Sequence, residues 1–380
     1  MKSFTDMRFP GYITAIIVIV LSITAACEAA DGENVVAFDK VWRYATLYEN
    51  EDNRFVQKFA LSGRLQLDAA WFDANEGDYN DVLWRRFRFG FKSDLFRNWV
   101  LHLEGDFDHN NKLGEAYSRL TDAYIGWSPK DNLTIKALKQ SAGFTLDGAT
   151  SSKKLLTMQR DNLTNNLWFT SEYFTGLLAK GDMGRNWKYK AGVFSSDGSD
   201  ELSQFEASYF TLFSLAYHLT ESLNLDEGMV RLDYVYNDED VDADTRDFSQ
   251  VLSLVTKWKT GPWGLWSDIS AGKGYAEQSN VWGVVLMPFY NVTKHIQPVF
   301  RYTYLHSDEH NGLRLGRYEN RIINNRGDEY NEIYGGLNIF FYGHKFKWQT
   351  GLQYAKMKDS ADDGGTYDGW GLSTGLRLSW

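Results

Sequence analysis

The sequence predicts an all-β protein, a transmembrane antiparallel β-barrel of about sixteen strands with a long inward-folded constriction loop. Three observations indicate this fold class. Between residues 55 and 380 the chain divides into segments of about ten residues in which apolar and polar side chains alternate. Short and long connections between these segments also alternate, and the chain ends on the aromatic residue Trp380.

The last segment shows the alternation most clearly. One face carries Trp370, Leu372, Thr374, Leu376, Leu378 and Trp380, and the other carries Ser373, Gly375, Arg377 and Ser379. A barrel wall with lipid outside and water inside needs this pattern, because successive side chains of a strand point to opposite faces.

The composition fits a barrel although it resembles that of a soluble protein. The mean hydropathy is -0.43, which is compatible with a barrel because only alternate residues face lipid. Aromatic residues make up 16% of the chain and only 5 residues are proline, as expected for aromatic girdles and many hydrogen-bonded strands. The chain shows no internal repeat, which argues against a propeller.

Residues 1–30 are predicted to form a secretory signal peptide. Lys2 and Arg8 precede an apolar run from 12 to 23, and small residues surround the expected cleavage position at Ala29 or Ala30. An uncleaved anchor and a lipid on Cys27 remain alternatives, although the apolar run is shorter than the ~20 residues of a spanning helix. Cleavage after Ala29 would leave a mature chain without cysteine, and so without disulfides or zinc-thiolate sites.

The remaining chain is divided into an N-terminal periplasmic segment (31–54), in which 36–47 favours a short helix, and a barrel domain (55–380). Short turns are expected at 96–98, 128–131, 184–186, 220–224, 260–262, 291–294 and 342–343. Long Asp/Asn/Gly-rich connections are expected at 73–82, 109–117, 142–170, 196–207, 238–247, 274–280, 306–328 and 357–368. This arrangement joins sixteen strands and puts both ends of the barrel domain on the periplasmic side.

The connection at 142–170 is longer than a hairpin requires, which is typical of a functional loop. Ser151 or Ser152 is positioned to cap a helical turn within 153–161. Folded inward, the loop would narrow a pore; on the rim, it would form a surface lid. We favour the inward position.

The alternation assigns each charged side chain of a strand to the lumen or to lipid. The basic residues assigned to the inner wall are Lys58, Arg64, Arg86, Arg88, Lys92, Lys136, Lys188, Lys190, Arg231, Lys257, Arg301, Lys345, Lys347 and Arg377. The acidic ones are Asp68, Glu104, Asp106, Asp108, Asp122, Asp233 and Glu332.

This inner wall carries fourteen basic and seven acidic residues, although the whole chain has a net charge of -10. The acidic surplus concentrates in long loops such as 237–247 and 358–368. Basic rings in a low-dielectric wall select anions, so the pattern favours anion passage. The alternative is that charges of both signs only keep a wide lumen wet.

Three stretches resemble the phosphate-selective porin O/P family of outer-membrane porins. They are FALSGRLQLDAAWFD (59–73), WRRFRFGFKSDLFRNWVLHLEGDFD (84–108) and the segment 122–176 that contains GFTLDGATSSKKLLTMQRDNLTNN. The resemblance implies a trimer of sixteen-stranded barrels in the bacterial outer membrane. It also implies that Arg86 and Arg88 line the channel and that Lys153, Lys154 and Arg160 lie at the constriction loop.

The chain departs from the phosphate-specific members, which place many arginines along the channel. After Thr211 its strands offer only the scattered Arg231, Lys257 and Arg301 to the lumen. Family membership is therefore better supported than phosphate specificity.

No catalytic, metal or cofactor site is predicted. Asp240, Asp242 and Asp244 imitate a calcium loop but lack its glycine and its terminal Glu. His306 and His310, with two acidic neighbours, lie in a polar loop without ligand spacing on a rigid element. The sequence has no Gly-x-Ser-x-Gly elbow, so an enzyme is not expected.

We therefore expect a porin for small hydrophilic solutes in contact with outer-membrane lipid, with a preference for phosphate or similar anions and no nucleic-acid partner. The expected anion-binding residues are Arg64, Arg86, Arg88, Lys92, Lys136, Lys153, Lys154, Arg160, Lys188, Lys190 and Arg301. The alternatives are a general or sugar-passing porin and a structural or adhesive barrel with a plugged lumen.

Overall fold

The computed structural model describes residues 33–107, 110, 116–169, 172–203 and 205–380. The predicted signal peptide, residues 1–30, and the predicted inward-facing Asp108 lie outside these residues. Within the described chain, no helix has the length and apolar character required to span a membrane.

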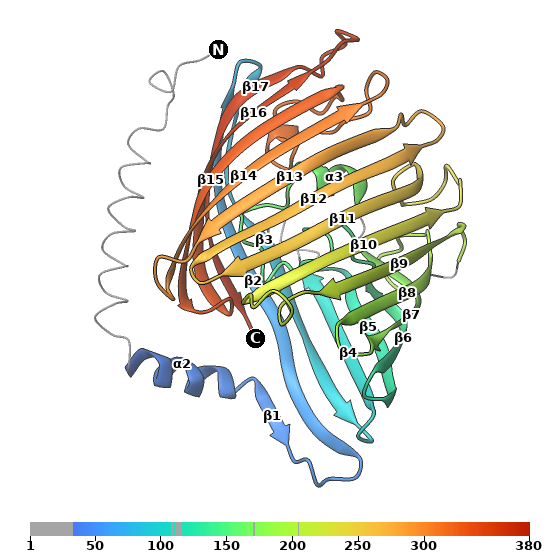
Figure 1. The fold of residues 1–380 in the computed structure, drawn as a ribbon, viewed down its shortest axis with the longest axis vertical. Helices are drawn as coiled ribbons and strands as arrows, with labels where there is room; N and C mark the ends of the chain where they lie inside the picture. The colour runs from blue at the N-terminus through green and yellow to red at the C-terminus, as the bar shows by residue number, and fades with distance from the viewer. Residues whose placement is uncertain (1–32, 108–109, 111–115, 170–171, 204) are drawn as a thin grey trace.

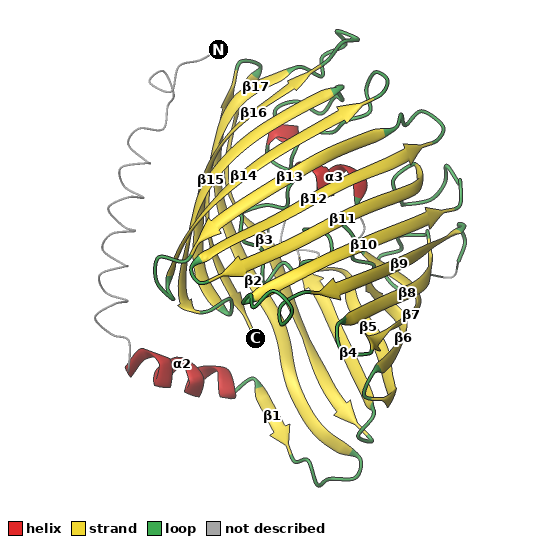
Figure 2. Cartoon of the chain, viewed as in Figure 1, coloured by secondary structure: helices red, strands yellow, loops and turns green. Residues whose placement is uncertain are grey.

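Sixteen antiparallel strands of the described chain close into a barrel (Figures 1 and 2). They are β2 (Val56–Ala74), β3 (Gly77–Leu95), β4 (Trp99–Phe107), β5 (Tyr117–Lys130), β6 (Leu133–Ser141), β7 (Tyr173–Met183), β8 (Trp187–Ser195), β9 (Tyr209–His218), β10 (Glu227–Asn237), β11 (Phe248–Thr260), β12 (Trp263–Gly274), β13 (Val281–Tyr290), β14 (Ile296–Ser307), β15 (Glu329–Tyr342), β16 (Phe346–Lys358) and β17 (Tyr367–Ser379). Each pairs with its neighbour in sequence, and β17 closes the ring on β2 with Ser379 opposite Arg64. Closure satisfies the backbone hydrogen bonds that an open edge would expose to lipid.

The N-terminal segment lies at the short-turn end of the barrel. Helix α2 (Glu33–Arg43) begins earlier than the predicted helix, and the short strand β1 (Thr46–Glu49) pairs with β2. Trp42 donates its indole N–H to the carbonyl oxygen of Ser379 at 2.7 Å and stacks on Phe346. These contacts fasten the helix beside the C-terminus of the chain.

Aromatic pairs occur near both rims of the barrel. Trp99–Trp127, Trp187–Tyr217 and Trp263–Tyr290 pack near the short turns, and Tyr209–Tyr236, Trp282–Tyr304 and Tyr354–Trp370 pack near the long loops. Between them the outward faces carry exposed apolar side chains such as Leu252 and Ile269. This band matches the girdled lipid-facing surface of an outer-membrane barrel.

The prediction of a long connection at 73–82 is wrong, because β2 and β3 continue into it and leave only residues 75 and 76 as the turn. The polar composition of this stretch suggested a loop. The hairpin is held instead by packing of Phe72 and Tyr79 against Tyr318, with ring centroids 5.5 and 6.0 Å apart. The other seven long connections agree with the strand ends within a few residues.

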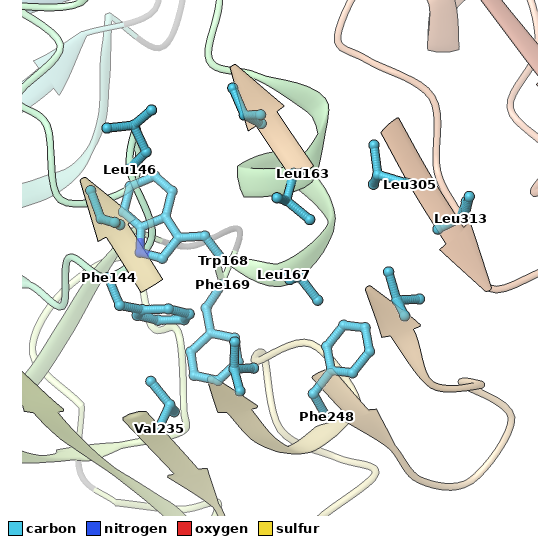
Figure 3. Close-up of a cluster of buried hydrophobic side chains, with 14 of the residues drawn as sticks. Phe144, Leu146, Leu163, Leu167, Trp168, Phe169, Val235, Phe248, Leu305 and Leu313 are labelled. Atoms are coloured by element: carbon cyan, nitrogen blue, oxygen red, sulfur yellow. The ribbon is translucent and has the colours of Figure 1, made fainter. Parts of the chain in front are cut away.

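The lumen contains an apolar core on one side. Figure 3 shows Phe144, Leu163, Leu167 and Phe169 of the 142–172 segment packed with Val235, Phe248 and Leu305 of the wall. These wall residues belong to β10, β11 and β14 and point inward. The loop shields this part of the inner wall from water, so the inward side chains there can be apolar. Several later strands are therefore apolar on both faces.

Candidate functional site

Residues 142–169 and Glu172 lie within the ring of strands, and this segment is hydrogen-bonded to strands on opposite sides of it. Arg64 of β2 donates to the Ser152 hydroxyl at 2.8 Å, and Lys347 of β16 donates to the Leu155 carbonyl at 2.6 Å. Asp268 of β12 accepts the backbone N–H of Leu146 at 2.6 Å. Attachment to several strands gives the segment a fixed path across the lumen.

The sequence analysis expected a helical turn capped by Ser151 or Ser152, and the structure has a single turn there. Ser151 accepts the Lys154 N–H through its carbonyl at 2.7 Å and the Lys153 N–H through its hydroxyl at 3.4 Å. The helix in this segment is α3 (Asn162–Leu167), and Asp161 caps it by accepting the backbone N–H of Thr164 at 2.6 Å. Residues 153–160 form turns instead. The Asp161 carboxylate also accepts the Thr164 hydroxyl at 2.9 Å, which favours this later start.

Arg301 and Arg64 form buried ion pairs with other residues of the wall and donate hydrogen bonds to the loop. Both Arg301 and its partner Glu332 are nearly inaccessible, with side chains 2% and 3% exposed, and two Arg301 nitrogens contact the carboxylate at 2.8 and 3.1 Å. Arg301 also donates to the Thr157 hydroxyl at 2.9 Å. Arg64 pairs with Glu104 at 2.8 Å. These enclosed guanidinium groups hold the loop on the wall rather than meeting open water.

Glu172, at the end of the loop, lies among three arginines. Its carboxylate is 2.9 Å from Arg160 and 3.6 Å from both Arg86 and Arg88. Arg88 also pairs with Asp106 at 3.1 Å. Arg86 donates to the Gln66 side chain at 2.9 Å, while its buried Nε atom has no hydrogen-bond partner in the described chain. Three positive groups therefore share one carboxylate at this point of the lumen.

Above this group, on the long-loop side, the structure contains a cavity of about 610 Å³, which we call the arginine cavity. Its lining includes Arg85, Arg119, Arg160, Arg246, Arg314, Arg317, Arg321, Arg326, Gln159, Asn165, Trp168, Asn320, Asn324, Asn325 and Glu172. Among the described residues of this lining, Glu172 is the one with an acidic side chain.

Most of these arginines have no carboxylate nearby. In the described part of the chain only Arg160 and Arg119 of the eight have a carboxylate oxygen within 4.0 Å. The arginines of 314–326 come from the 308–328 loop, which the sequence analysis expected only as a long Asp/Asn/Gly-rich connection at 306–328. The described lining therefore carries a positive charge that Glu172 and the more distant Asp68 and Asp247 offset only in part.

Two features bring these arginines inward. Arg85 is the extra residue of a β-bulge, since Gln66 pairs with Arg86 while Leu67 pairs with Trp84. The 308–328 loop is fixed to the wall by Tyr318, whose hydroxyl donates to Asp68 at 2.6 Å.

Glu319, in the short helix η2 (Glu319–Arg321), is buried and also attaches the 308–328 loop to the wall. It accepts hydrogen bonds from the backbone N–H of Gly316 at 2.8 Å and from Gln353 at 2.7 Å. Burial, and then the nearby Glu332 carboxylate, raises the pKa of Glu319 to about 7.

The guanidinium groups of the cavity repel one another. Burial, and then the neighbouring Arg246 and Arg326, lowers the pKa of Arg314 to about 9. Burial and Arg326 likewise lower the pKa of Arg246 to about 10. A bound anion would relieve this repulsion.

The predicted lysines lie apart from the arginine cavity. Lys92, Lys154 and Lys188 are exposed, Lys188 lies 3.6 Å from Asp182, and Lys153 donates to the Trp380 carbonyl at 3.0 Å. Lys136 packs over the Tyr124 ring at 3.6 Å. The predicted site residues thus form three sets. Some attach the loop to the wall, some surround Glu172, and the lysines lie towards the short-turn end.

Two further lysine contacts complete this end of the lumen. Lys190 donates to the Gly143 carbonyl and so supports the start of the loop. Lys180, which the sequence analysis did not select, lies opposite Lys190 in the β7–β8 pairing and within electrostatic range of Lys92 and Lys188. Its inward position follows from the same alternation that identified its neighbours.

The sequence analysis considered His306 and His310, with their acidic neighbours, as metal ligands and did not predict a site there. Among the residues that the structure describes, no three His, Cys, Asp or Glu side chains are grouped closely enough to hold a metal ion. His310 instead lies 2.8 Å from the Ser360 hydroxyl.

The fold is similar to those of several solved porins. The anion-selective porin from Comamonas acidovorans matches with a TM-score of 0.59 and 12% identity over 85% of this chain and 99% of that chain. OprB of Pseudomonas putida matches with 0.59 and 12% over 85% and 94%. OmpF of Salmonella typhi matches with 0.61 and 12% over 88% and 100%. At this identity the likeness establishes the fold alone.

No curated protein sequence matches the chain significantly. The family model of phosphate-selective porins O and P matches residues 59–378, which is almost the whole barrel. A sixteen-stranded barrel with aromatic rims is the form of a bacterial outer-membrane channel. The chain therefore belongs to the phosphate-selective porin O and P family and is an outer-membrane porin.

Proposed function

We propose that this porin passes small anions such as phosphate in preference to cations. The observation that carries the proposal is the arginine cavity, whose described lining contains eight guanidinium groups and one carboxylate. A cleft lined by one sign of charge and walled by low-dielectric material concentrates the opposite ion. The net charge of the whole chain, -10, does not oppose this, because selectivity depends on the charges that the ion meets.

An anion that enters from outside first meets the arginine cavity. At the inner end of this cavity it meets Glu172 and Arg160, backed by the enclosed Arg86 and Arg88, and the carboxylate already neutralises part of the positive charge. Conduction needs weak binding, because a site that holds its ion tightly stops the current. We propose that the Glu172 carboxylate keeps anion binding weak at this position.

Beyond Glu172, Lys92, Lys136 and Lys188 are proposed to line the periplasmic half, together with Lys180. Lys153 and Lys154 are proposed to line the neighbouring part of the constriction loop, and Lys190 supports it. Arg64 and Arg301 are assigned to attachment of the loop rather than to direct contact with the ion.

The remaining proposals concern processing and assembly. Residues 1–30 would be removed as a signal peptide, and 31–54 would lie on the periplasmic side, which agrees with the position of α2 beside the C-terminus. A homotrimer is proposed from the family; OmpT of Vibrio cholerae, which shares 8% identity at a TM-score of 0.50, has been solved in a trimer form.

The reversal potential of the purified protein in a planar bilayer under a KCl gradient tests the proposal. We expect a shift towards the chloride equilibrium potential, and a smaller shift for Arg314→Gln/Arg317→Gln. Lys356→Gln/Lys358→Gln is the matched control, since these lysines pair with Asp368 and Glu329 outside the arginine cavity. Cation selectivity would contradict the proposal, and negligible conductance would support a plugged barrel instead.

A further inference from the structure

The arginine cavity is large for an inorganic anion. Its volume is about 610 Å³, whereas drug-sized ligands occupy pockets of about 300–1,000 Å³. A single phosphate would contact only one part of such a cavity. The size therefore suits an organic solute that reaches several walls at once.

The uncompensated arginines form two groups. Arg85 lies within electrostatic range of Arg317, which acts on Tyr79 together with Arg321. Arg314 lies within range of Arg246 and Arg326. No described carboxylate oxygen lies within 4.0 Å of any of these six side chains. Two separate positive groups suit a ligand with two separate negative groups.

The second group also has unused hydrogen-bonding capacity. Arg246 donates one Nη to the Asn165 carbonyl at 3.2 Å, while its buried Nε has no hydrogen-bond partner in the described chain. Guanidinium groups bind carboxylates through paired N–H donors. The Nε itself is enclosed, so a carboxylate bound by this group would meet the guanidinium groups of Arg314 and Arg326, which line the same cavity.

Amide side chains lie among the arginines. Gln159, Asn320, Asn324 and Asn325 line the same cavity, whereas the Trp168 ring is buried and covered by the Arg160 guanidinium, 4.5 Å from the ring centroid. Amides both donate and accept hydrogen bonds, so they suit the hydroxyl groups of a sugar. A cluster of four amide side chains would not be needed to hold a simple inorganic anion.

We propose that the arginine cavity binds an acidic oligosaccharide, in which carboxylate groups on neighbouring sugar rings engage the two arginine groups. The inference rests on the proposed anion preference and names the solute class. Engagement of both groups by one molecule makes the second contact intramolecular, which strengthens binding beyond that of either acid alone.

Block of the chloride current in planar bilayers tests this inference with three probes added from the extracellular side. The probes are digalacturonate, galacturonate and maltose, compared at equal ionic strength. We expect digalacturonate to bind at least tenfold more tightly than galacturonate, and maltose to bind more weakly than either. Arg317→Gln/Arg321→Gln removes two of the three arginines of the first group and is expected to reduce digalacturonate to the affinity of galacturonate.

These two arginines are suitable targets because their side chains are exposed and make no hydrogen bond within the described residues, so the barrel should still fold. Lys356→Gln/Lys358→Gln removes the same charge outside the cavity and should leave digalacturonate binding within twofold of wild type. If the channel is anion-selective but binds digalacturonate and galacturonate with equal affinity, the oligosaccharide inference is overturned while the proposed function stands. Unchanged digalacturonate block in the arginine variant would overturn it as well, whereas cation selectivity of the wild type would overturn the proposed function itself.

Discussion

Glu172 is expected to set the strength of anion binding at the narrow part of the channel. Its carboxylate lies 2.9 Å from Arg160 and 3.6 Å from Arg86 and Arg88. A passing anion is attracted by the three arginines and repelled by this carboxylate. Glu172→Gln preserves the size of the side chain and an oxygen that accepts from Arg160, but removes the charge.

The magnitude follows from Coulomb's law. Two unit charges 4 Å apart interact with about 1 kcal/mol in water and about 4 kcal/mol at an effective dielectric constant of 20. The lumen lies between these limits, because it is wet but walled by protein. Since about 1.4 kcal/mol corresponds to a tenfold change in affinity, we expect Glu172→Gln to tighten phosphate binding about tenfold or more.

The assay is titration of phosphate into a chloride solution while the current through single channels is recorded. In Glu172→Gln, phosphate should block at lower concentration and each block should last longer. The effect should shrink in 1 M salt, where the Debye length is about 3 Å. Glu221→Gln is the control, because it removes the same charge from an exposed side chain paired with Arg185 at a short turn.

One result would refute this reasoning. If Glu172→Gln keeps the heat-modifiable mobility of a folded barrel but binds phosphate no more tightly than wild type, the carboxylate does not weaken anion binding. Glu172→Asp supplies a second check, since it retains the charge and should block like wild type.

Three other predictions concern the loops. Arg301→Ala leaves Glu332 buried without its partner and should destabilise the barrel by about 3–5 kcal/mol; urea unfolding measures this, and Arg185→Ala, which breaks an exposed pair, should cost at most about 1 kcal/mol. Asp161→Ala removes the cap of α3 and should cost about 0.5–2 kcal/mol, with noisier single-channel currents; an unchanged unfolding midpoint would argue against the cap. Because the folded-state pKa of Glu319 is raised to about 7 from 4.5, its contribution to stability is complete below pH 4.5 and is lost as pH rises through 7. The unfolding midpoint should therefore fall between pH 5 and 8 in wild type more than in Glu319→Gln, and equal slopes would contradict the assignment.

The barrel was predictable because strand alternation and connection length are local properties of a sequence. Alternation placed Arg64, Arg86 and Arg88 on the inner wall, and the structure buries all three there. The polar hairpin at 73–82 misled the prediction, since its pairing depends on contact with Tyr318, about 240 residues later in the chain.

The arginine cavity was not predictable in the same way. Loop residues have no periodicity, so the direction of Arg314, Arg317 and Arg321 depends on tertiary contacts made by Tyr318 and Glu319. Arg85 was missed because a bulge shifts the alternation by one residue. Alternation alone cannot locate either kind of position.

One available signal was overlooked. Strands β11 and β13 carry apolar residues on both faces, with Val251, Val255 and Val285 inward and buried. A water-filled lumen does not favour such an inner wall. The pattern therefore indicated that the 142–170 loop covers this side of the barrel and confines the polar route to the other side.

The most direct test of the central claim is the position of bound anions in crystals soaked in bromide, located by anomalous scattering. We expect bromide in the arginine cavity, beside Arg246, Arg314 and Arg326, and beside Arg86 near Glu172. Bromide confined to the outer surface of the barrel, with none along the lumen, would contradict the claim that these arginines draw anions into the channel.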